Sequence, residues 1–268
     1  MQKLYEESNI QAIANAIRAK NGTEETYKPS EMAGAITAIK DNYDKLIGKT
    51  ITEISSKVTE VGAYALYSCS NLTSADFPKA VTLNDYAFYS TSALVNINFP
   101  LVRSIGRYTF RGAGFENAYF PAATSIGANS FAYNTALKTA KFPKLTETAG
   151  SSFSSCSALV SVDLPKATTI GTYSFEKCYS LKALILRSTT ACALDNTSAF
   201  NSCYHILGTT NSTYNPSGSK DGYIYVPSAL INTYKTATNW STYATQFRAL
   251  ESYTVDGTIT GELDESKI

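Results

Sequence analysis

Apolar residues recur along most of the chain with a period of about 22 residues. A column of mainly aromatic positions, all expected to be buried, reads Leu66, Phe88, Phe110, Phe131, Phe153 and Phe175, and Phe200 continues it. A proline column keeps the same register at Pro78, Pro100, Pro121, Pro143 and Pro165. A third, mostly aliphatic column, usually followed by glycine, reads Val61, Leu83, Ile105, Ile126, Thr148 and Ile170. Three columns in one register indicate internal repeats.

Each repeat contains a short segment in which apolar and polar residues are arranged as in a strand. In the first repeat the expected inward residues are Leu72, Ala75 and Phe77, and the expected outward residues are Thr73, Ser74 and Asp76. The proline ends the strand because it has no N–H for the ladder. The glycine of the third column is expected to allow a tight corner. One repeat cannot bury its own apolar face, so the repeats are predicted to stack into a solenoid.

Three repeats depart from this pattern. The sixth ends in Leu186-Arg187 where proline is expected. The third, Ile105–Pro121, is one residue short, with Gly112-Ala113-Gly114 where other repeats have Cys-Ser. The seventh is interrupted by a stretch rich in Ser, Thr, Asn and Gly, residues 207–221, which is predicted to be a surface loop.

The motif I-G-x-x-[AST]-F-x-x-C-x-x-L-x-x-[AIV]-x-F-P resembles the BspA-like, or Treponema-type, leucine-rich repeats over about Ile47 to Pro227. This resemblance implies an α/β, β-rich fold, a right-handed leucine-rich-repeat solenoid of about seven repeats over residues 47–227. It also implies a protein that binds and is not an enzyme.

Residues 1–46 are predicted to form a helical hairpin and a linker. Apolar residues at helical spacing follow Ser8, a good helix N-cap, and a second helix is predicted from Pro29 to Ile39. The segment resembles an N-terminal module of structural proteins of phages and prophages of gut Firmicutes. That resemblance implies attachment or oligomerisation, while an N-terminal cap of the solenoid is an equally good interpretation.

Residues 228–268 are predicted to form a C-terminal helical cap and a tail. Apolar and aromatic residues over Ser228–Leu250 indicate two short helices that cover the last repeat. The polar stretch Glu251–Ile268 is expected to be a mobile tail or a docking strand.

The cysteines and the one histidine offer little chemistry. Four of the five cysteines share a column that Thr91, Ala113 and Asn134 occupy elsewhere, which indicates a small, part-buried position. Free structural thiols are favoured, although Cys156 and Cys178 lie in adjacent repeats and a disulfide between them stays open. His205 is expected to be solvated at the start of the loop. We find no zinc, calcium or phosphate-binding motif, and we expect no catalytic residue, no metal and no cofactor.

The outward positions of the predicted strands form a candidate binding face. Its columns include Asn96, Asn117, Ala183 and Ile185, and the side chains selected as candidates are Asp76, Asn98, Glu116, Tyr119, Lys138, Lys141, Asp163, Lys182 and Tyr225. Tyr119 between Glu116 and Lys141 is the best single patch, because exposed aromatic residues among charges are typical of hot spots. A solvated face without a ligand is the alternative for each residue.

Composition and charge narrow the choice of partner. The net charge is +1, which argues against nucleic acid, and no apolar run is long enough to span a membrane. Met1–Ile10 lacks the features of a signal peptide. The leading hypothesis is a protein associated with a phage or prophage virion, cytoplasmic before assembly and extracellular if a particle delivers it.

Such a protein would bind a protein or glycan on a bacterial surface, and residues 1–40 would contact other virion proteins or a second copy. Two alternatives stay open: a BspA-like surface or secreted adhesin, and a structural spacer or decoration protein without a specific ligand.

Overall fold

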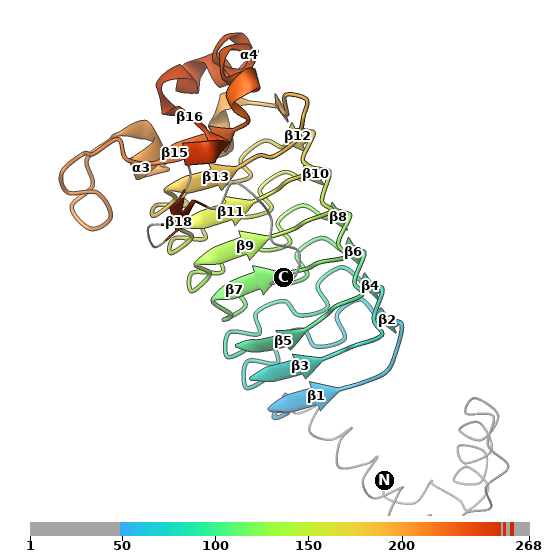
Figure 1. Cartoon of the computed structure of the whole chain (residues 1–268). Helices are drawn as coiled ribbons and strands as arrows, with labels where there is room; N and C mark the ends of the chain where they lie inside the picture. The colour runs from blue at the N-terminus through green and yellow to red at the C-terminus, as the bar shows by residue number, and fades with distance from the viewer. Residues whose placement is uncertain (1–48, 253, 256–257, 260–268) are drawn as a thin grey trace, which may run out of the picture. The chain divides into compact units, whose positions relative to one another are not determined.

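The computed structural model describes residues 49–252, 254–255 and 258–259 (Figure 1). The chain divides into two units, Met1–Lys45 and Leu46–Ile268, and all described residues belong to the second. The predicted hairpin over residues 1–46 therefore lies outside the described residues, as does most of the tail. Among the described residues no helix has the length and apolar character needed to cross a membrane.

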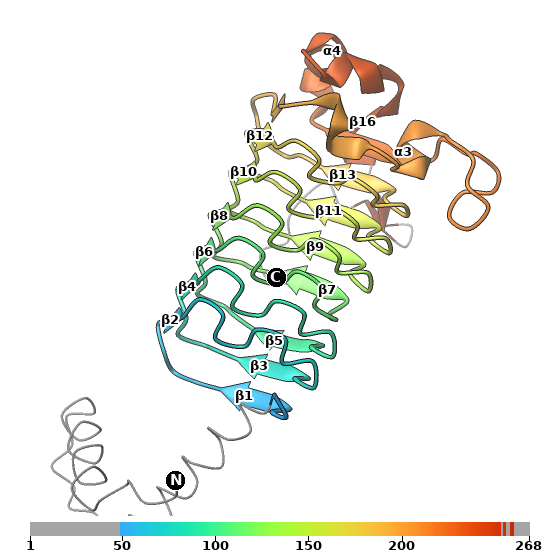
Figure 2. The ribbon, with the colours of Figure 1, turned by 180° about the vertical axis from the view of Figure 1, so that it is seen from behind.

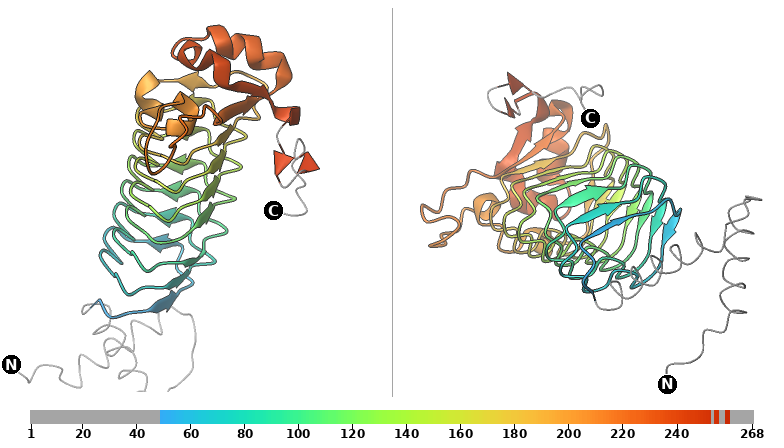
Figure 3. Two further views of the ribbon diagram at one scale, coloured as in Figure 1. Left: turned by 90° about the vertical axis from the view of Figure 1, so that its left-hand side faces the viewer. Right: turned by 90° about the horizontal axis from the view of Figure 1, so that it is seen from below.

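A row of short parallel strands follows one side of the stacked coils (Figures 1 and 3). Equivalent residues of successive repeats pair, as Ala75 does with Ile97 and Ala140 with Val162. This confirms the strand predicted before each proline. The strands are β1 (Glu53–Ser55), β3 (Ser74–Asp76), β5 (Asn96–Asn98), β7 (Asn117–Tyr119), β9 (Thr139–Lys141), β11 (Ser161–Asp163), β13 (Ala183–Ile185), β15 (Tyr223–Val226) and β16 (Phe247–Ala249).

A second row of strands lies where the sequence predicted only a corner (Figure 2). Each has two residues, one pointing into the core, which is too short for an alternating pattern to be recognised. They pair in parallel as two groups, β2 to β8 and β10 to β14. The strands are β2 (Glu60–Val61), β4 (Thr82–Leu83), β6 (Ser104–Ile105), β8 (Ser125–Ile126), β10 (Glu147–Thr148), β12 (Thr169–Ile170) and β14 (Ala193–Leu194).

The aromatic column forms a continuous stack through the core. From Phe88 to Phe200 each ring lies on the next, with centroids 5.2 to 5.7 Å apart. A second stack, Phe77, Phe99, Phe120 and Phe142, meets the first edge-on or at a tilt. Stacked and edge-to-face rings are favoured beyond the apolar area that they bury.

The glycine that follows the aliphatic column has another role than the predicted corner. A Cβ on Gly106, Gly127 or Gly171 would lie 2.6, 2.5 or 2.4 Å from backbone atoms of the preceding coil. None of the three has a positive φ, and the left-handed positions two residues on are held instead by residues such as Tyr86 and Tyr108. These glycines are therefore needed for close approach between coils.

Residues after β15 contact the last coil through aromatic side chains. Trp240 Nε1 donates to the Cys192 carbonyl at 2.6 Å, and the Cys192 N–H donates to Tyr234 Oη at 2.8 Å. Beyond the two helices expected here, β16 extends the sheet beside β15. The remaining elements are η1 (Thr197–Phe200), α3 (Tyr204–Leu207), η2 (Ser228–Leu230), α4 (Ile231–Thr236), η3 (Trp240–Gln246), η4 (Leu250–Ser252), and the antiparallel pair β17 (Thr254–Val255) and β18 (Thr258–Ile259).

Replacing Gly127 by alanine is expected to lower the free energy of unfolding by roughly 1–3 kcal/mol, because the new methyl group forces two coils apart. Gly62→Ala is the control, since nothing lies within 4 Å of a Cβ there. It should be neutral, or stabilising by up to about 1 kcal/mol through the unfolded chain. Urea unfolding of both variants measures the difference, and equal effects would contradict the close-approach role.

Candidate binding face and its break

The nine candidate residues lie on or beside the long row of strands, as predicted. Tyr119 is in β7 with 38% of its surface exposed. Neighbouring coils are joined by polar side chains across this face. Asn98 Nδ2 donates to Asp76 Oδ1 at 2.7 Å, and Lys138 Nζ lies 2.8 Å from Glu116 Oε2. The Lys138–Glu116 pair is more than half exposed, so it contributes little to stability and leaves both groups open to a ligand.

Towards β13 and β15 the prediction of an open face is wrong. Ala183 and Ile185, expected to point outward, are buried with Leu250, and Tyr225 packs against them. Asp163 binds Arg187 through contacts of 3.2 to 3.4 Å, and their side chains are only 13% and 11% exposed. The face is covered here because the chain returns after β16. Asp163 and Tyr225 are therefore part of the structure of this end.

The row of strands is interrupted between β5 and β7 (Figure 1). Phe77 N–H donates to the Asn98 carbonyl at 2.9 Å, and Phe120 N–H donates to the Lys141 carbonyl at 3.2 Å. Within the described chain, no equivalent bond joins Phe99 N–H to the Tyr119 carbonyl.

The interruption coincides with the repeat that is one residue short. A Cβ on Gly114 would lie 2.2 Å from the Ser92 carbonyl oxygen, so the shortened turn is pressed against the preceding coil. Phe115 fills the column that leucine occupies in other repeats, and it is fully buried. The missing residue shifts β7 away from β5 while the core beneath stays packed.

A pocket opens at this break, lined by Ile97, Asn98, Phe99, Pro100, Asn117, Tyr119 and Pro121. Its walls combine apolar rings with two amides and one phenol, which donate and accept hydrogen bonds without carrying charge. Such a site can bind a ligand non-covalently. The pocket contains Asn98 and Tyr119 of the predicted set, but the short repeat was not predicted to form a site, because a missing residue in one repeat does not by itself indicate a pocket.

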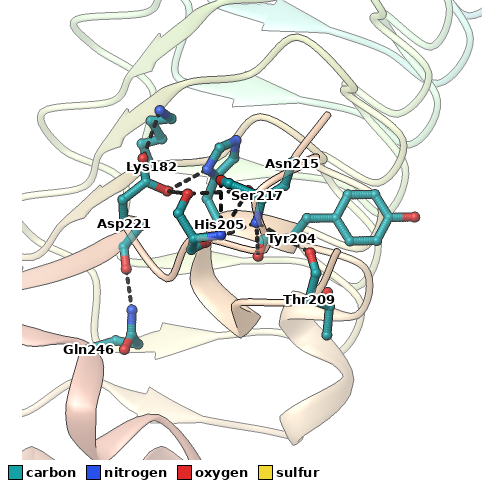
Figure 4. Close-up of polar contacts among 10 residues, drawn as sticks. Lys182, Tyr204, His205, Thr209, Asn215, Ser217, Asp221 and Gln246 are labelled. Atoms are coloured by element: carbon teal, nitrogen blue, oxygen red, sulfur yellow. Dashed lines mark hydrogen bonds and ion pairs between the residues drawn. The ribbon is translucent and has the colours of Figure 1, made fainter. Parts of the chain in front are cut away.

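His205 is not solvated, contrary to the prediction. It lies in α3 with 8% of its surface exposed, and its Nδ1 is 2.5 Å from Asp221 Oδ1 (Figure 4). Lys182 Nζ reaches the other carboxylate oxygen at 2.9 Å. Burial alone would raise the pKa of Asp221, but hydrogen bonds from Lys182, His205 and Ser219 outweigh it and hold the pKa well below its usual range.

Asn215 organises the inserted loop next to this cluster (Figure 4). Its Nδ2 donates to the carbonyls of Tyr204, Thr209 and Ser219 at 2.8 to 3.2 Å. Its Oδ1 accepts from the Ser219 N–H at 3.0 Å, and Asn215 itself is buried. The predicted surface loop is thus held to α3 by Asn215 and to β13's neighbour Lys182 by Asp221.

The cysteine column was predicted to need only a small residue, but most of its residues also donate a hydrogen bond. The thiols of Cys156, Cys178 and Cys203 donate to the carbonyls of the phenylalanines one coil back, at 3.0 to 3.1 Å. Thr91 and Asn134 also donate to phenylalanine carbonyls from this column. All five cysteines are buried and free. Burial raises the pKa of Cys156 to about 12 and that of Cys203 further, so neither provides a thiolate nucleophile for His205.

A family model for the BspA type leucine rich repeat region matches residues 41–113 and 103–213 in six copies. No curated protein matches the chain. Among solved structures, a leucine-rich repeat protein of T. pallidum is 25% identical, with 48% of this chain and 53% of that one covered and a TM-score of 0.35.

Two further leucine-rich repeat proteins show similar relations. One from Eubacterium ventriosum is 27% identical, covering 67% of this chain and 42% of that one, with a TM-score of 0.39. One from Bacteroides ovatus is 19% identical, covering 74% and 66%, with a TM-score of 0.36. The chain thus spans between 42% and 66% of the length of these proteins. The TM-scores are all below 0.5, so the family assignment depends on the match to the repeat family model.

Replacing Asp221 by alanine is expected to destabilise the chain by about 1–2 kcal/mol at pH 7, because buried His205 loses a charged partner. We take this low range because the Asp221 side chain is 41% exposed. Its folded pKa is depressed, so the contribution is full above the unfolded value of about 4 and is lost as the pH falls below it. Urea unfolding should therefore show a smaller difference in the free energy of unfolding between parent and variant at about pH 3 than at pH 7. Glu116→Ala, which removes a carboxylate whose side chain is 55% exposed, is the control. A difference in stability between the parent and Asp221→Ala that stays the same at both pH values would contradict the assignment.

The five thiols are expected to be unreactive in the folded chain. At about pH 8 a buried thiol with a raised pKa is almost wholly protonated, so a thiol reagent should label none of them within minutes. In denaturant without reductant all five should titrate at once. Three thiols in denaturant would instead show that one pair is oxidised, and fast labelling of the folded chain would contradict the burial.

Proposed function

The chain belongs to the BspA-type leucine-rich-repeat family, and from that premise we propose that it is a non-catalytic binding protein. The observation that carries the proposal is the pocket at the break between β5 and β7, where Tyr119, Asn98 and Asn117 meet. Where one repeat departs from the others, a repeat protein has a surface feature that its regular repeats lack. The ligand is held there by phenol and amide hydrogen bonds over an apolar floor.

The nucleophiles and bases of the solenoid support binding over catalysis. The Cys203 thiol donates to the Phe175 carbonyl and is buried, while His205 is engaged by Asp221. Neither group lines the pocket. Among the described residues no cluster of three or more metal-ligating side chains occurs.

The segment after β15 is proposed to be the C-terminal cap of the solenoid. Tyr234, Trp240 and Phe247 lie beside one another, and Phe200, the last ring of the core stack, contacts Trp240 and Tyr243. Without this cover the last coil would expose an apolar end to water, which repeat proteins avoid. Because β13 and β15 are covered here and Asp163 of β11 is paired with Arg187, the proposed binding face is confined to the strands from β3 to β9.

The partner proposed from the sequence is a protein or glycan on a bacterial surface. Attachment to a phage or prophage virion through residues 1–40 is the setting that the N-terminal resemblance favours. A BspA-like adhesin at a bacterial surface is the alternative, and family membership supports it. Both place Tyr119 at the ligand, whereas a spacer or decoration protein would bind nothing at this pocket.

Replacing Tyr119 by alanine is expected to weaken binding to host cells or wall fractions by about tenfold or more. Truncation of a central aromatic residue typically costs about 2 kcal/mol or more of binding free energy. Tyr173→Ala is the matched control, since Tyr173 is 42% exposed against 38% for Tyr119 and does not line the pocket. Binding of labelled full-length protein to cells and extracted walls gives the measurement. No binding by the parent would favour the spacer, and equal loss in both variants would contradict the pocket as the binding site.

A further inference from the structure

A second surface of exposed and half-buried aromatic rings lies on the turns that follow β2, β4, β6 and β8, away from the long row of strands (Figure 2). Tyr64, Tyr86 and Tyr108 stack on one another with centroids 4.8 Å apart. Tyr67 and Tyr89 form a parallel stack at 4.9 Å. The rings cover one another's faces, so the surface presents a double row of ring edges and phenol hydroxyls, one step per coil.

The backbone holds these rings at a conformational cost. Tyr64, Tyr86 and Tyr108 have φ values of 60, 60 and 57°, in the left-handed region that bulky residues rarely adopt. The next two coils have Asn129 and Ser151 at the equivalent position, and the coil after them has Tyr173. Tyrosine is thus not required by the fold at this position, and its use in the first coils indicates a role at the surface.

Arg111 lies at the end of the double row and has no acidic partner within the described chain. Its guanidinium carbon is 4.3 Å from the ring centre of Tyr133 and 5.4 Å from that of Tyr89, and its Nη1 donates to Tyr89 Oη at 2.6 Å. The neighbouring Arg107 differs, because Nε lies 3.4 Å from Asp85 Oδ2. Arg111 therefore keeps several N–H donors for a ligand, and the Tyr89 hydroxyl, which accepts from Arg111, can donate its own hydrogen.

We propose that this tyrosine–arginine patch, residues Tyr64, Tyr67, Tyr86, Tyr89, Tyr108, Arg111 and Tyr133, binds an acidic polysaccharide built from uronic acids. A carboxylate of the polymer lies against the guanidinium of Arg111 and the hydroxyl of Tyr89, because a guanidinium matches a carboxylate in a two-bond geometry. Sugar hydroxyls along the chain meet the phenol hydroxyls, which both donate and accept. The exposed ring of Tyr133 offers an apolar surface to a sugar ring.

The backbone of the ridge favours a sugar polymer over an acidic peptide. The backbone N–H groups of the segment Tyr86–Ser90 that point to the next coil donate to its carbonyls, at Arg107, Thr109 and Arg111. These N–H groups are therefore already used within the solenoid. A peptide would find no free strand edge along this row, whereas a polysaccharide needs only side-chain hydroxyls, ring edges and a cation. The patch contains one arginine without an acidic partner beside many phenol hydroxyls. This matches a ligand that has many hydroxyls and widely spaced negative charges.

The test is calorimetric titration of the full chain with polygalacturonate, alginate and hyaluronan, with a neutral methyl-esterified polygalacturonate and polyglutamate for comparison. We expect at least one polyuronate to bind, and Arg111→Met to weaken it by about tenfold, as for loss of a charge-assisted hydrogen bond. Arg107→Met removes the same charge one turn away and should change the affinity less than about twofold, because Arg107 is already paired. Thermal unfolding of both variants checks that they fold equally well.

Several outcomes overturn the proposal. No binding of any polyuronate does so, as does equal loss in Arg111→Met and Arg107→Met, which would show non-specific attraction. Polyglutamate binding as strongly as the polyuronates would indicate an acidic protein as the ligand. Tyr119→Ala should leave polyuronate binding unchanged, so this surface and the pocket at the break between β5 and β7 succeed or fail independently.

Discussion

The stacking of one coil on the next in a fixed register is the interaction on which the rest of the structure depends. Each phenylalanine ring from Phe88 to Phe200 lies on its equivalent in the neighbouring coil, and backbone N–H groups donate from coil to coil beside it. A coil has no core of its own, so its apolar residues are buried only by its neighbours. The columns are constrained by this contact: Cys156, Cys178 and Cys203 donate to carbonyls of the preceding coil. Gly106, Gly127 and Gly171 leave room for its backbone.

This constraint makes small departures from the repeat informative. In most globular proteins a surface loop tolerates a one-residue deletion without a shift of the strands or helices that it connects. In a solenoid it moves a strand against its neighbours, and here it separates β7 from β5 while β6 and β8 still pair on the other row. The long insertion in the seventh repeat lies near the end of the stack, where Asn215 and Asp221 tie it down. The candidate pocket therefore lies where the register is broken within the stack.

The sequence predicted the parts of the fold that repeat, since each core column is visible several times. The strands before the prolines, the phenylalanine column and the buried cysteines were all recognisable in this way. The second row of strands was not, because two residues carry no alternation, and the glycine role was wrong because a contact with another coil is not written in one repeat. His205, Ala183 and Ile185 were misplaced for a related reason: segments far along the chain, around Asp221 and Leu250, return to cover them.

Amide hydrogen exchange at Phe99 tests most directly the claim that the short third repeat opens the sheet into a site. We expect the Phe99 amide to exchange at least about tenfold faster than the amides of Phe77 and Phe142, which donate across the row of strands. Inserting one serine between Ala113 and Gly114 should restore the length of the repeat and slow the exchange at Phe99 to the rate of its equivalents. Equal protection of all three amides in the parent chain, or an insertion without effect, would contradict the account.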